Sequence, residues 1–273
     1  MKRQLIYITA LVLLLTACVE DNADGTTTEQ TEELPEVEEV GEERIEVVDE
    51  KDAVENVKVE IEQPLYELNT ATWRLEPIEG ANSQVVLLTF DDAPDKHALD
   101  MAKTLKELDA PAIFFVNGHF IDSDEKKATL KKIHELGFTI GNHTKTHANL
   151  QQLSEKEQAD EILDVSDVIE KVIGERPKFF RAPFGQNTDY SKALVEEEGM
   201  LLMNWSFGYD WEKQYMDATA IADIMVNTEL LQDGANLLMH DREWTSDGLR
   251  QIVEGLRARG YDFIDPSTIR GLE

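Results

Sequence analysis

The sequence predicts an α/β domain with a parallel sheet, because strand-like and helix-like segments alternate along most of the chain. Short apolar runs that suit buried strands are separated by stretches in which apolar residues recur every three or four positions. Glycines stand between several of these helical stretches and the next strand, at the position where a left-handed residue commonly ends a helix. They are Gly137, Gly174, Gly199 and Gly260.

Seven strands and six helices are expected in this domain. The strands are expected at 85–90, 112–116, 138–142, 178–181, 200–206, 235–240 and 261–265. The helices are expected at 98–108, 124–136, 155–173, 190–198, 217–230 and 246–258. The strand at 85–90 is apolar except for Thr89, as in strands buried on both faces. The helix at 155–173 begins with the capping box Ser154…Glu157.

The pattern alone leaves two architectures open, a shortened and imperfect (β/α) barrel and an open doubly wound sheet. An ordinary eight-fold barrel takes about 250 residues, and the alternating region here spans only residues 84–270. No glycine-rich dinucleotide fingerprint follows any expected strand, which disfavours a cofactor-binding doubly wound sheet.

The first residues of the chain are typical of a secretory signal. Lys2 and Arg3 precede an apolar run of ten residues, 6–15, which is too short to span a bilayer as a helix. Small residues then precede Cys18, the only cysteine, and the segment resembles a bacterial lipoprotein signal. The resemblance implies removal of residues 1–17 and lipidation of Cys18. We therefore expect the protein at the outer face of the bacterial cell membrane, anchored by a lipid.

The charge of the chain is unevenly distributed, and this divides it further. The formal net charge is −30, which argues against binding to nucleic acid. Residues 19–62 contain 18 acidic residues, three basic residues and no aromatic residue, so we expect 18–62 to be a disordered acidic tether. Residues 63–83, where aromatic residues return, are expected to cap a catalytic domain at 84–273. One cysteine excludes an internal disulfide framework.

Reactive side chains follow five of the expected strands. Because the carboxyl ends of parallel strands meet at one edge of the sheet, we expect these side chains to converge. Each of them alone could be a turn, cap or packing residue. They are Asp91 and Asp92, His143 and His147, Arg181, Asp210 with Trp211, and His240.

His143 and His147 are expected one helical turn apart. Their two imidazoles and one carboxylate would make a metal site with open positions. The same ligands suit catalytic zinc and non-heme iron, so ligand type does not fix the metal. One of the adjacent aspartates would bind the metal and the other would contact a water that the metal acidifies. An arginine beside that second aspartate would keep it ionised. His240 could protonate a leaving group.

The order of these motifs resembles the NodB-like polysaccharide deacetylases (carbohydrate esterase family 4). The resemblance covers about residues 84–270. The motifs are Thr89-Phe90-Asp91-Asp92-Ala93-Pro94, His143-Thr144-Lys145-Thr146-His147, Arg181-Ala182-Pro183-Phe184-Gly185, Asp210-Trp211 and Leu237-Leu238-Met239-His240. It implies a distorted, shortened (β/α) barrel of about seven parallel strands and a metal-dependent hydrolase that removes acetyl groups from sugars.

The resemblance also implies a role for each matching residue. Asp91 corresponds to the general base, positioned by Arg181, and His240 to the general acid, tuned by Asp210. The metal ligands would be Asp92, His143 and His147. The backbone N–H of Phe184 would help to stabilise the oxyanion, and the acetyl methyl would lie against Pro183, Trp211 and Leu238. The family usually has glycine where this chain has Ala93, which would cost about 1 kcal/mol if that residue needed a positive φ.

The substrate expected from this resemblance is an acetylated cell-wall polysaccharide, with peptidoglycan first and chitin oligomers or acetylated xylan next. The metal would be one divalent ion, zinc before cobalt, nickel, manganese or iron, and the protein is expected to be a monomer. Two alternatives remain at this stage. Ala93 and the acidic surface of residues 63–273 would suit a non-catalytic wall-binding lipoprotein, and the ligand set would also permit an iron oxygenase. Trp205 is expected in the core.

Overall fold

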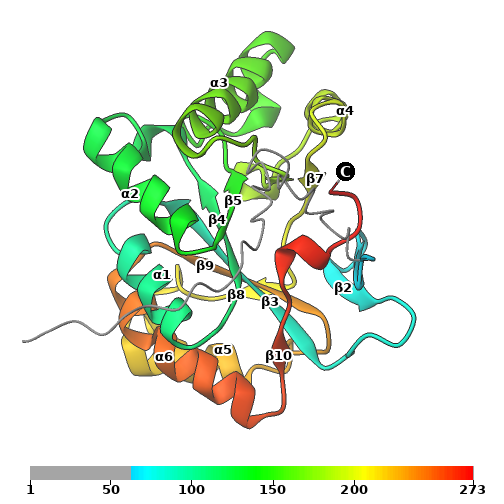
Figure 1. The fold of residues 1–273 in the computed structure, drawn as a ribbon, viewed down its shortest axis with the longest axis vertical. Coiled ribbons are helices and arrows are strands. Elements are labelled where there is room, and N and C mark those ends of the chain that lie inside the picture. Colours follow the sequence, from blue (N-terminus) through cyan, green and yellow to red (C-terminus); the bar gives the residue numbers. More distant parts are fainter. Residues whose placement is uncertain (1–62, 273) are drawn as a thin grey trace, which may run out of the picture. The chain divides into compact units, whose positions relative to one another are not determined.

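The computed structural model describes residues 63–272 (Figure 1). The predicted signal segment 1–17, the predicted lipidation site Cys18 and the predicted tether 18–62 lie outside the described residues. Among residues 63–272, none of the helices combines the length and the apolar character that crossing a membrane requires.

A curled parallel sheet forms the centre of the domain, as expected for a shortened (β/α) barrel. Its strands run in the order β7-β6-β5-β4-β3-β9-β8, and β10 pairs with the beginning of β3. Their bounds are β3 (Val85–Ala93), β4 (Ala112–Val116), β5 (Thr139–Asn142), β6 (Phe179–Phe180), β7 (Leu201–Leu202), β8 (Phe207–Gly208), β9 (Ala235–His240) and β10 (Asp262–Phe263). Every pairing in this sheet is parallel.

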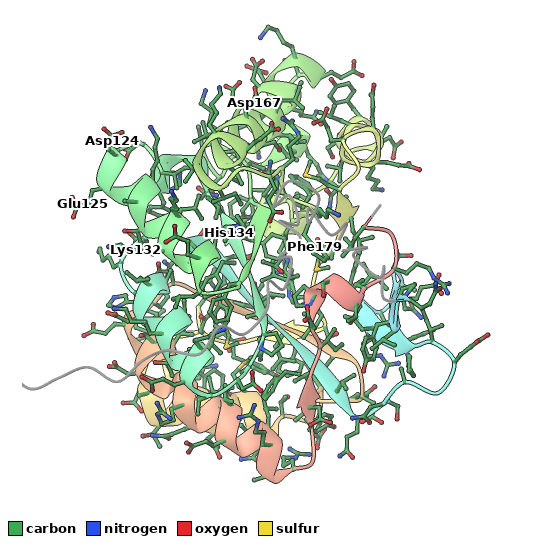
Figure 2. The ribbon with its side chains drawn as sticks, in the orientation of Figure 1. Asp124, Glu125, Lys132, His134, Asp167 and Phe179 are labelled. Atoms are coloured by element: carbon green, nitrogen blue, oxygen red, sulfur yellow. The ribbon has the colours of Figure 1, made fainter. Side chains whose placement is uncertain are left out.

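Six α-helices cover the outer face of the sheet, and Figure 1 shows them following one another around it. They pack against one another in the order α5-α6-α1-α2-α3-α4. Their bounds are α1 (Ala98–Glu107), α2 (Asp124–Glu135), α3 (Glu155–Ile173), α4 (Asp189–Glu197), α5 (Ala218–Asn227) and α6 (Glu243–Ala258). In α2 the acidic residues Asp124 and Glu125 lie in the first turn and the basic residues Lys132 and His134 in the last, which complements the helix dipole (Figure 2).

Side chains of the central strands alternate between two cores. On β3, Val86, Leu88 and Phe90 belong to the cluster that includes the helices, and Val85 and Leu87 belong to the cluster on the inner face. Phe179 of β6, labelled in Figure 2, lies in the same inner cluster. This period of two, with apolar residues on both faces, explains why the strands appear in the sequence as continuous apolar runs.

The strand expected at 200–206 forms only in part, because β7 ends at Leu202 and the next strand, β8, begins beyond the segment at Phe207, with a seam between them. β7 pairs with β6, and β8 pairs with β9 on the opposite edge of the sheet. Between them, the carbonyl oxygen of Asn204 accepts hydrogen bonds from the side chains of Arg181 (2.9 Å) and Asn236 (2.9 Å). A carbonyl occupied by two side chains cannot extend a strand ladder, so the sheet is open at this point.

A β-hairpin precedes the sheet and is attached to it. Its strands are β1 (Tyr66–Asn69) and β2 (Arg74–Pro77). The backbone N–H of Leu75 donates to the carbonyl oxygen of Gly234 at 2.8 Å. Gly234 has a φ of 73°, and a Cβ there would lie 2.0 Å from the Leu75 carbonyl oxygen, so only glycine allows this approach. Leu75 and Tyr66 are buried in the inner core.

Candidate active site

The carboxyl ends of the strands surround a cavity of about 360 Å³. Asp91 and Asp92 stand at the end of β3, His143 follows β5, and His240 ends β9. These residues converge on the cavity because all the strands that carry them are parallel. The cavity is lined by Asp91, Asp92, His143, His147, Phe184, Trp205, Trp211, Leu238, His240 and Arg242.

Asp91 forms a buried ion pair with Arg181. The Nη1 atom of Arg181 lies 2.8 Å from Oδ1 of Asp91, and the arginine side chain is fully buried. The same guanidinium donates to Thr89, to Asn236 and to the carbonyl oxygen of Asn204, and it stacks over the ring of Phe115. A buried charge with this many partners keeps a fixed position. The Asp91 carboxylate is therefore held in one orientation, with its Oδ2 atom 3.6 Å from Nε2 of His143.

Asp92, His143 and His147 form the group of three that the sequence predicted. Each can offer one ligand atom, and these atoms all lie within 4.8 Å of one another. The Nδ1 atom of His143 lies 2.7 Å from the Arg181 carbonyl oxygen. A carbonyl oxygen only accepts, so Nδ1 carries the hydrogen and Nε2 presents its lone pair to the other two residues.

The sequence analysis expected the two histidines to be one helical turn apart, and the structure differs. Residues 143–147 form an irregular loop in which Thr144 and His147 have φ values of 68° and 61°. The loop is fixed by side chains: Oδ1 of Asn142 accepts from the N–H of Thr144, and Glu161 accepts from both the N–H and the hydroxyl of Thr146. Side-chain acceptors have replaced helical hydrogen bonds, and the left-handed residues turn both imidazoles toward Asp92.

Burial and neighbouring charges shift the pKa values of two of these groups. Burial, followed by the neighbouring His143, lowers the pKa of His147 despite the nearby carboxylates, which favours a neutral imidazole able to bind a metal. Burial would raise the pKa of Asp92, but the positive charges that His143, His240 and His147 carry when protonated, together with that of Arg242, outweigh it and hold this pKa below its ordinary value. Asp92 is therefore ionised.

His240 faces the cavity opposite this group and is oriented by Asp210. Nδ1 of His240 donates to Oδ1 of Asp210 at 2.7 Å, and Oδ2 of Asp210 accepts from the His240 backbone N–H and the Thr245 hydroxyl. Burial opposes protonation of His240, but the hydrogen bond and charge of Asp210, with Asp91 and Asp92 nearby, raise its pKa above the ordinary value. Its Nε2 can then hold a proton toward the cavity.

Comparisons with known proteins agree with this geometry. A family model described as polysaccharide deacetylase matches residues 79–203. The chain is 31% identical over 218 residues to a peptidoglycan-N-acetylglucosamine deacetylase from Bacillus cereus, covering 76% of this chain and 77% of that protein. The chain belongs to the polysaccharide deacetylase family. It is accordingly an enzyme of the polysaccharide deacetylase class, and the expectation of a family 4 carbohydrate esterase is confirmed.

Two solved structures place this polysaccharide deacetylase among its relatives. The peptidoglycan deacetylase PdaC from Bacillus subtilis is 30% identical, with a TM-score of 0.61 over 68% of this chain and 90% of that chain. A family 4 carbohydrate esterase described as a pseudoenzyme, from Bacillus anthracis, is 25% identical, with a TM-score of 0.60 over 67% and 63% of the two chains. The fold is therefore shared by proteins described as active and as inactive.

Ala93 does not strain the backbone of this deacetylase. The residue with the positive φ in this motif is its neighbour Asp92, at 61°, while Ala93 ends β3 and precedes the cis peptide bond to Pro94. The methyl group of Ala93 is 1% exposed and packs in the core with the helices, outside the described lining of the cavity. The substitution thus neither strains nor narrows the site, and it gives no structural support to a non-catalytic protein.

Most of the residues predicted to contact the substrate line the cavity of the deacetylase, but one does not. Phe184 (59% exposed), Trp211 (46% exposed) and the largely buried Leu238 line the cavity. Pro183 is buried and is not among its described lining residues. Trp205, which was expected in the core, lines the cavity instead, because the strand expected there is interrupted.

Two functional positions were missed by the sequence analysis of the deacetylase. Nη2 of Arg242 lies 2.8 Å from Oδ2 of Asp92, so this arginine holds the carboxylate oxygen that faces away from His147. Asp241 accepts from the backbone N–H groups of residues 95–98 and thereby joins the end of β9 to the start of α1. Both residues directly follow His240. Their position next to a motif at the end of a strand was the signal in the sequence that could have identified them.

Proposed function

We propose that this chain is a metal-dependent deacetylase that removes acetyl groups from N-acetylated amino sugars of peptidoglycan. One observation carries the proposal: a single cavity presents a carboxylate fixed by a buried arginine, a group of three side chains able to bind a metal, and an imidazole with a raised pKa. Amide hydrolysis needs a base, an electrophile that stabilises the oxyanion, and an acid, and these three features supply them.

The residues present fit a divalent metal, and zinc fits best. Two imidazoles and one carboxylate are the donor set of catalytic zinc sites with open positions. The Arg181 carbonyl fixes the tautomer of His143, as a hydrogen-bonded second layer does in such sites. A bound zinc ion would supply Lewis-acid chemistry, acidifying the attacking water and polarising the acetyl carbonyl. Cobalt, nickel, manganese or iron would accept the same ligands.

Asp91 is the proposed general base. Its Oδ1 atom is occupied by Arg181, so Oδ2 is the atom available to take a proton from the attacking water. Arg181 is a positioning residue: it fixes the carboxylate from the buried side and does not contact the substrate. A base in a fixed position loses little entropy when the water attacks.

His240 is the proposed general acid, with Asp210 as its positioning residue. The raised pKa favours the protonated imidazole, and Nε2 can deliver that proton to the leaving amine. Base and acid therefore belong to adjacent strands, β3 and β9, whose ends pair Asp91 with His240. The backbone N–H of Phe184 is the proposed additional donor to the oxyanion.

The acetyl group is proposed to enter between the aromatic and aliphatic walls of the cavity. Trp211 lies against the ring of His240, with 5.5 Å between centroids, and Leu238 forms part of the same wall. An apolar wall beside the acid suits the acetyl methyl and excludes water from the leaving amine. Pro183 can contribute only by setting the path of the chain into Phe184.

Peptidoglycan is the proposed polymer because the B. cereus relative is named a peptidoglycan-N-acetylglucosamine deacetylase. The sequence of residues 1–18 supports the same choice, since a lipid on Cys18 would hold the enzyme at the outer face of the cell membrane, next to the wall. The acidic segment 18–62 would then be a spacer. We propose that the enzyme acts as a monomer. Loss of labelled-lipid incorporation in Cys18→Ala would support the anchor, and unchanged incorporation would contradict it.

A panel of polymers tests the activity. The purified protein is incubated with peptidoglycan, chitin oligomers and acetylated xylan, acetate release is measured, and the metal content of the same sample is determined. We expect most acetate from peptidoglycan, loss of activity with a chelator, and recovery with zinc. A metal-loaded sample that releases acetate from none of these polymers would contradict the proposal.

A further inference from the structure

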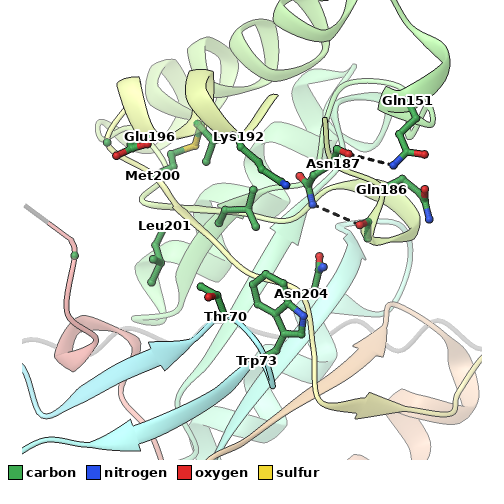
Figure 3. Close-up of a pocket in the computed structure, with 15 residues that line it drawn as sticks. Thr70, Trp73, Gln151, Gln186, Asn187, Lys192, Glu196, Met200, Leu201 and Asn204 are labelled. Atoms are coloured by element: carbon green, nitrogen blue, oxygen red, sulfur yellow. Dashed lines mark hydrogen bonds between the residues drawn. The ribbon is translucent and has the colours of Figure 1, made fainter. Parts of the chain in front are cut away.

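A second and larger cavity, of about 880 Å³, lies at the seam of the sheet (Figure 3). Its wall is formed by β7 and the end of α4, by the turn of the β1–β2 hairpin, and by loops that follow His147 and Arg181. Figure 3 shows Trp73 and Asn204 on one side of this space and Lys192 and Asn187 on the other. We call it the seam cavity.

The seam cavity adjoins the catalytic cavity through a common ridge. Phe184 lines the catalytic cavity and Gly185 the seam cavity, and in the same way Trp205 lines the first and Asn204 the second. The two halves of the ridge touch, because a Cβ on Gly185 would lie 3.3 Å from the Trp205 ring and 3.5 Å from the Asn204 amide. A chain-like ligand that crosses this ridge would occupy both cavities at once.

The lining of the seam cavity has the chemistry of a site for uncharged polyhydroxylated ligands. The indole of Trp73 offers an apolar face with one polar edge. Gln151, Asn187 and Asn204 offer side-chain amides, which donate and accept hydrogen bonds. Lys192 and Glu196 bring one charge of each sign, so neither an anion nor a cation is favoured. Aromatic faces and amides together recognise sugar rings and their hydroxyl and acetamido groups.

Two polar atoms in this lining lack a partner within residues 63–272. The Oδ1 atoms of Asn187 and Asn204 are buried and accept no hydrogen bond. Buried polar atoms in folded proteins nearly always have a partner, and one that does not needs an explanation. Because both atoms are covered, a rotation of the two amides would let hydroxyl or amide N–H groups of a bound sugar supply the missing donors.

The backbone of Trp73, whose indole lines the seam cavity, is also held in an unfavourable conformation. Trp73 has a φ of 59°, in the left-handed region, and its backbone N–H donates to the Asn69 carbonyl oxygen at 2.7 Å. The side chain of Asn69 accepts from Ala71 and Thr72, which fixes the turn. Non-glycine residues in such conformations are found most often at functional sites. The hairpin thus presents the indole in a fixed orientation next to Asn204.

We propose that the seam cavity is an accessory saccharide subsite, which binds one part of an acetylated glycan while another part of the same chain lies in the catalytic cavity. The inference rests on the proposed function for its substrate class. It predicts that longer oligosaccharides bind more tightly than short ones, and that this gain depends on Trp73 and Asn187 rather than on the metal ligands.

Binding and turnover are measured separately to test this. N-acetylglucosamine oligomers from dimer to hexamer are titrated by calorimetry into the Asp91→Asn protein, which would bind without turnover, with and without Trp73→Ala. We expect the substitution to weaken binding of the hexamer about tenfold and to leave the dimer unchanged. Trp73→Phe, which keeps an aromatic face, should retain most of the hexamer affinity. Asn187→Ala removes a side chain whose described hydrogen bond goes to the Gly185 carbonyl, and should weaken it by a smaller factor.

The outcomes separate this inference from the proposed function. Unchanged hexamer affinity in both Trp73→Ala and Asn187→Ala would overturn the subsite even if the enzyme releases acetate. Length-dependent binding that requires Trp73, in a protein that deacetylates no glycan, would support the subsite and contradict the proposed function. Equal losses for dimer and hexamer, or an effect seen only with peptide-bearing wall fragments, would also overturn a saccharide subsite. Thermal unfolding of each variant identifies losses caused by misfolding, in which case Asn187→Ala decides.

Discussion

The inner and outer parts of the candidate active site are built differently. The inner groups, Asp91, Arg181 and Asp210, are at most 2% exposed. Arg181 and Asp210 each have several hydrogen-bond partners, and Asp91 is held by Arg181. The outer groups, Asp92, His147 and Phe184, are partly or largely exposed, and all three have positive φ values. The proposed base and the residue that orients the proposed acid are thus fixed by packing, whereas two of the three proposed metal ligands and the aromatic rim stand on left-handed backbone.

The difference indicates that the two parts of the site have different roles. The core fixes the position of the groups that are proposed to transfer protons over short distances. The free-energy cost of positioning these groups is therefore part of folding and not of catalysis. Asp92, His147 and Phe184, which are proposed to admit the metal and the polymer, lie where side chains can still adjust. Substitution of the proposed base or of its buried arginine partner should therefore affect catalysis or stability strongly, substitutions in the outer part should change affinity more modestly, and Asp210, which only tunes the proposed acid, should mainly shift the pH dependence.

The largest effect is expected for Asp91→Asn. Asparagine keeps the shape of the side chain but cannot accept the proton, so acetate release should fall by about a thousandfold. Metal content should remain the same, because Asp91 is not in the proposed ligand set. Asp92→Asn is the matched control and should lose both. Retained turnover in Asp91→Asn would show that another group is the base.

Arg181→Met should lower the free energy of unfolding by about 3–5 kcal/mol, because it leaves the Asp91 carboxylate buried without its partner. Urea denaturation measures this change. Arg250→Met removes an arginine paired with Glu107 at the surface, where about half of its side chain is exposed, and should cost less than about 1 kcal/mol. Similar losses in the two variants would mean that the inner part is no more tightly built than the surface.

Arg242→Gln tests the outer part of the site. The arginine holds Oδ2 of Asp92, and losing it should let the carboxylate rotate, which weakens metal affinity by about tenfold. Competition with a chromophoric chelator measures this directly, without substrate. Arg242→Lys retains a charge at the site and should recover part of the affinity. Tighter metal binding in Arg242→Gln would show instead that the arginine competes with the metal.

The smallest effect is expected in the pH profile of Asp210→Asn. Asp210 raises the pKa of His240, so the wild-type acid stays protonated, and active, until the pH rises through that raised value. Removing the negative charge lowers this pKa, and the alkaline limb of the activity profile should move to lower pH. The same ion pair should add to folding stability at low pH and lose that contribution as the pH rises through the raised pKa. Thr245→Val, which leaves the Asp210–His240 contact intact, should move the limb less.

Much of this architecture could be predicted from local patterns. β3, β4 and β9 are buried on both faces, so their apolar runs mark them in the sequence. The convergence of Asp91, His143 and His240 followed from the parallel sheet alone, since side chains at strand ends must meet at one edge. Both predictions depend on contacts that repeat along the chain.

The missed features depend on contacts between distant residues. The strand expected at 200–206 is interrupted because Arg181 and Asn236 capture the carbonyl of Asn204, and no pattern within the segment shows this. Trp205 is turned into the cavity for the same reason. The path from His143 to His147 likewise depends on Glu161 of α3, which replaces the helical hydrogen bonds that the spacing suggested.

The attachment of the hairpin at Gly234 has a practical consequence for anyone who expresses this enzyme. The family match begins at residue 79, beyond both hairpin strands. A recombinant fragment trimmed to that border would uncover apolar surface now shielded by Leu75 and Tyr66, and would lose the tryptophan that forms one wall of the seam. A fragment truncated in this way would be prone to aggregate. A polymer preference measured on this fragment would not represent that of the protein with its hairpin.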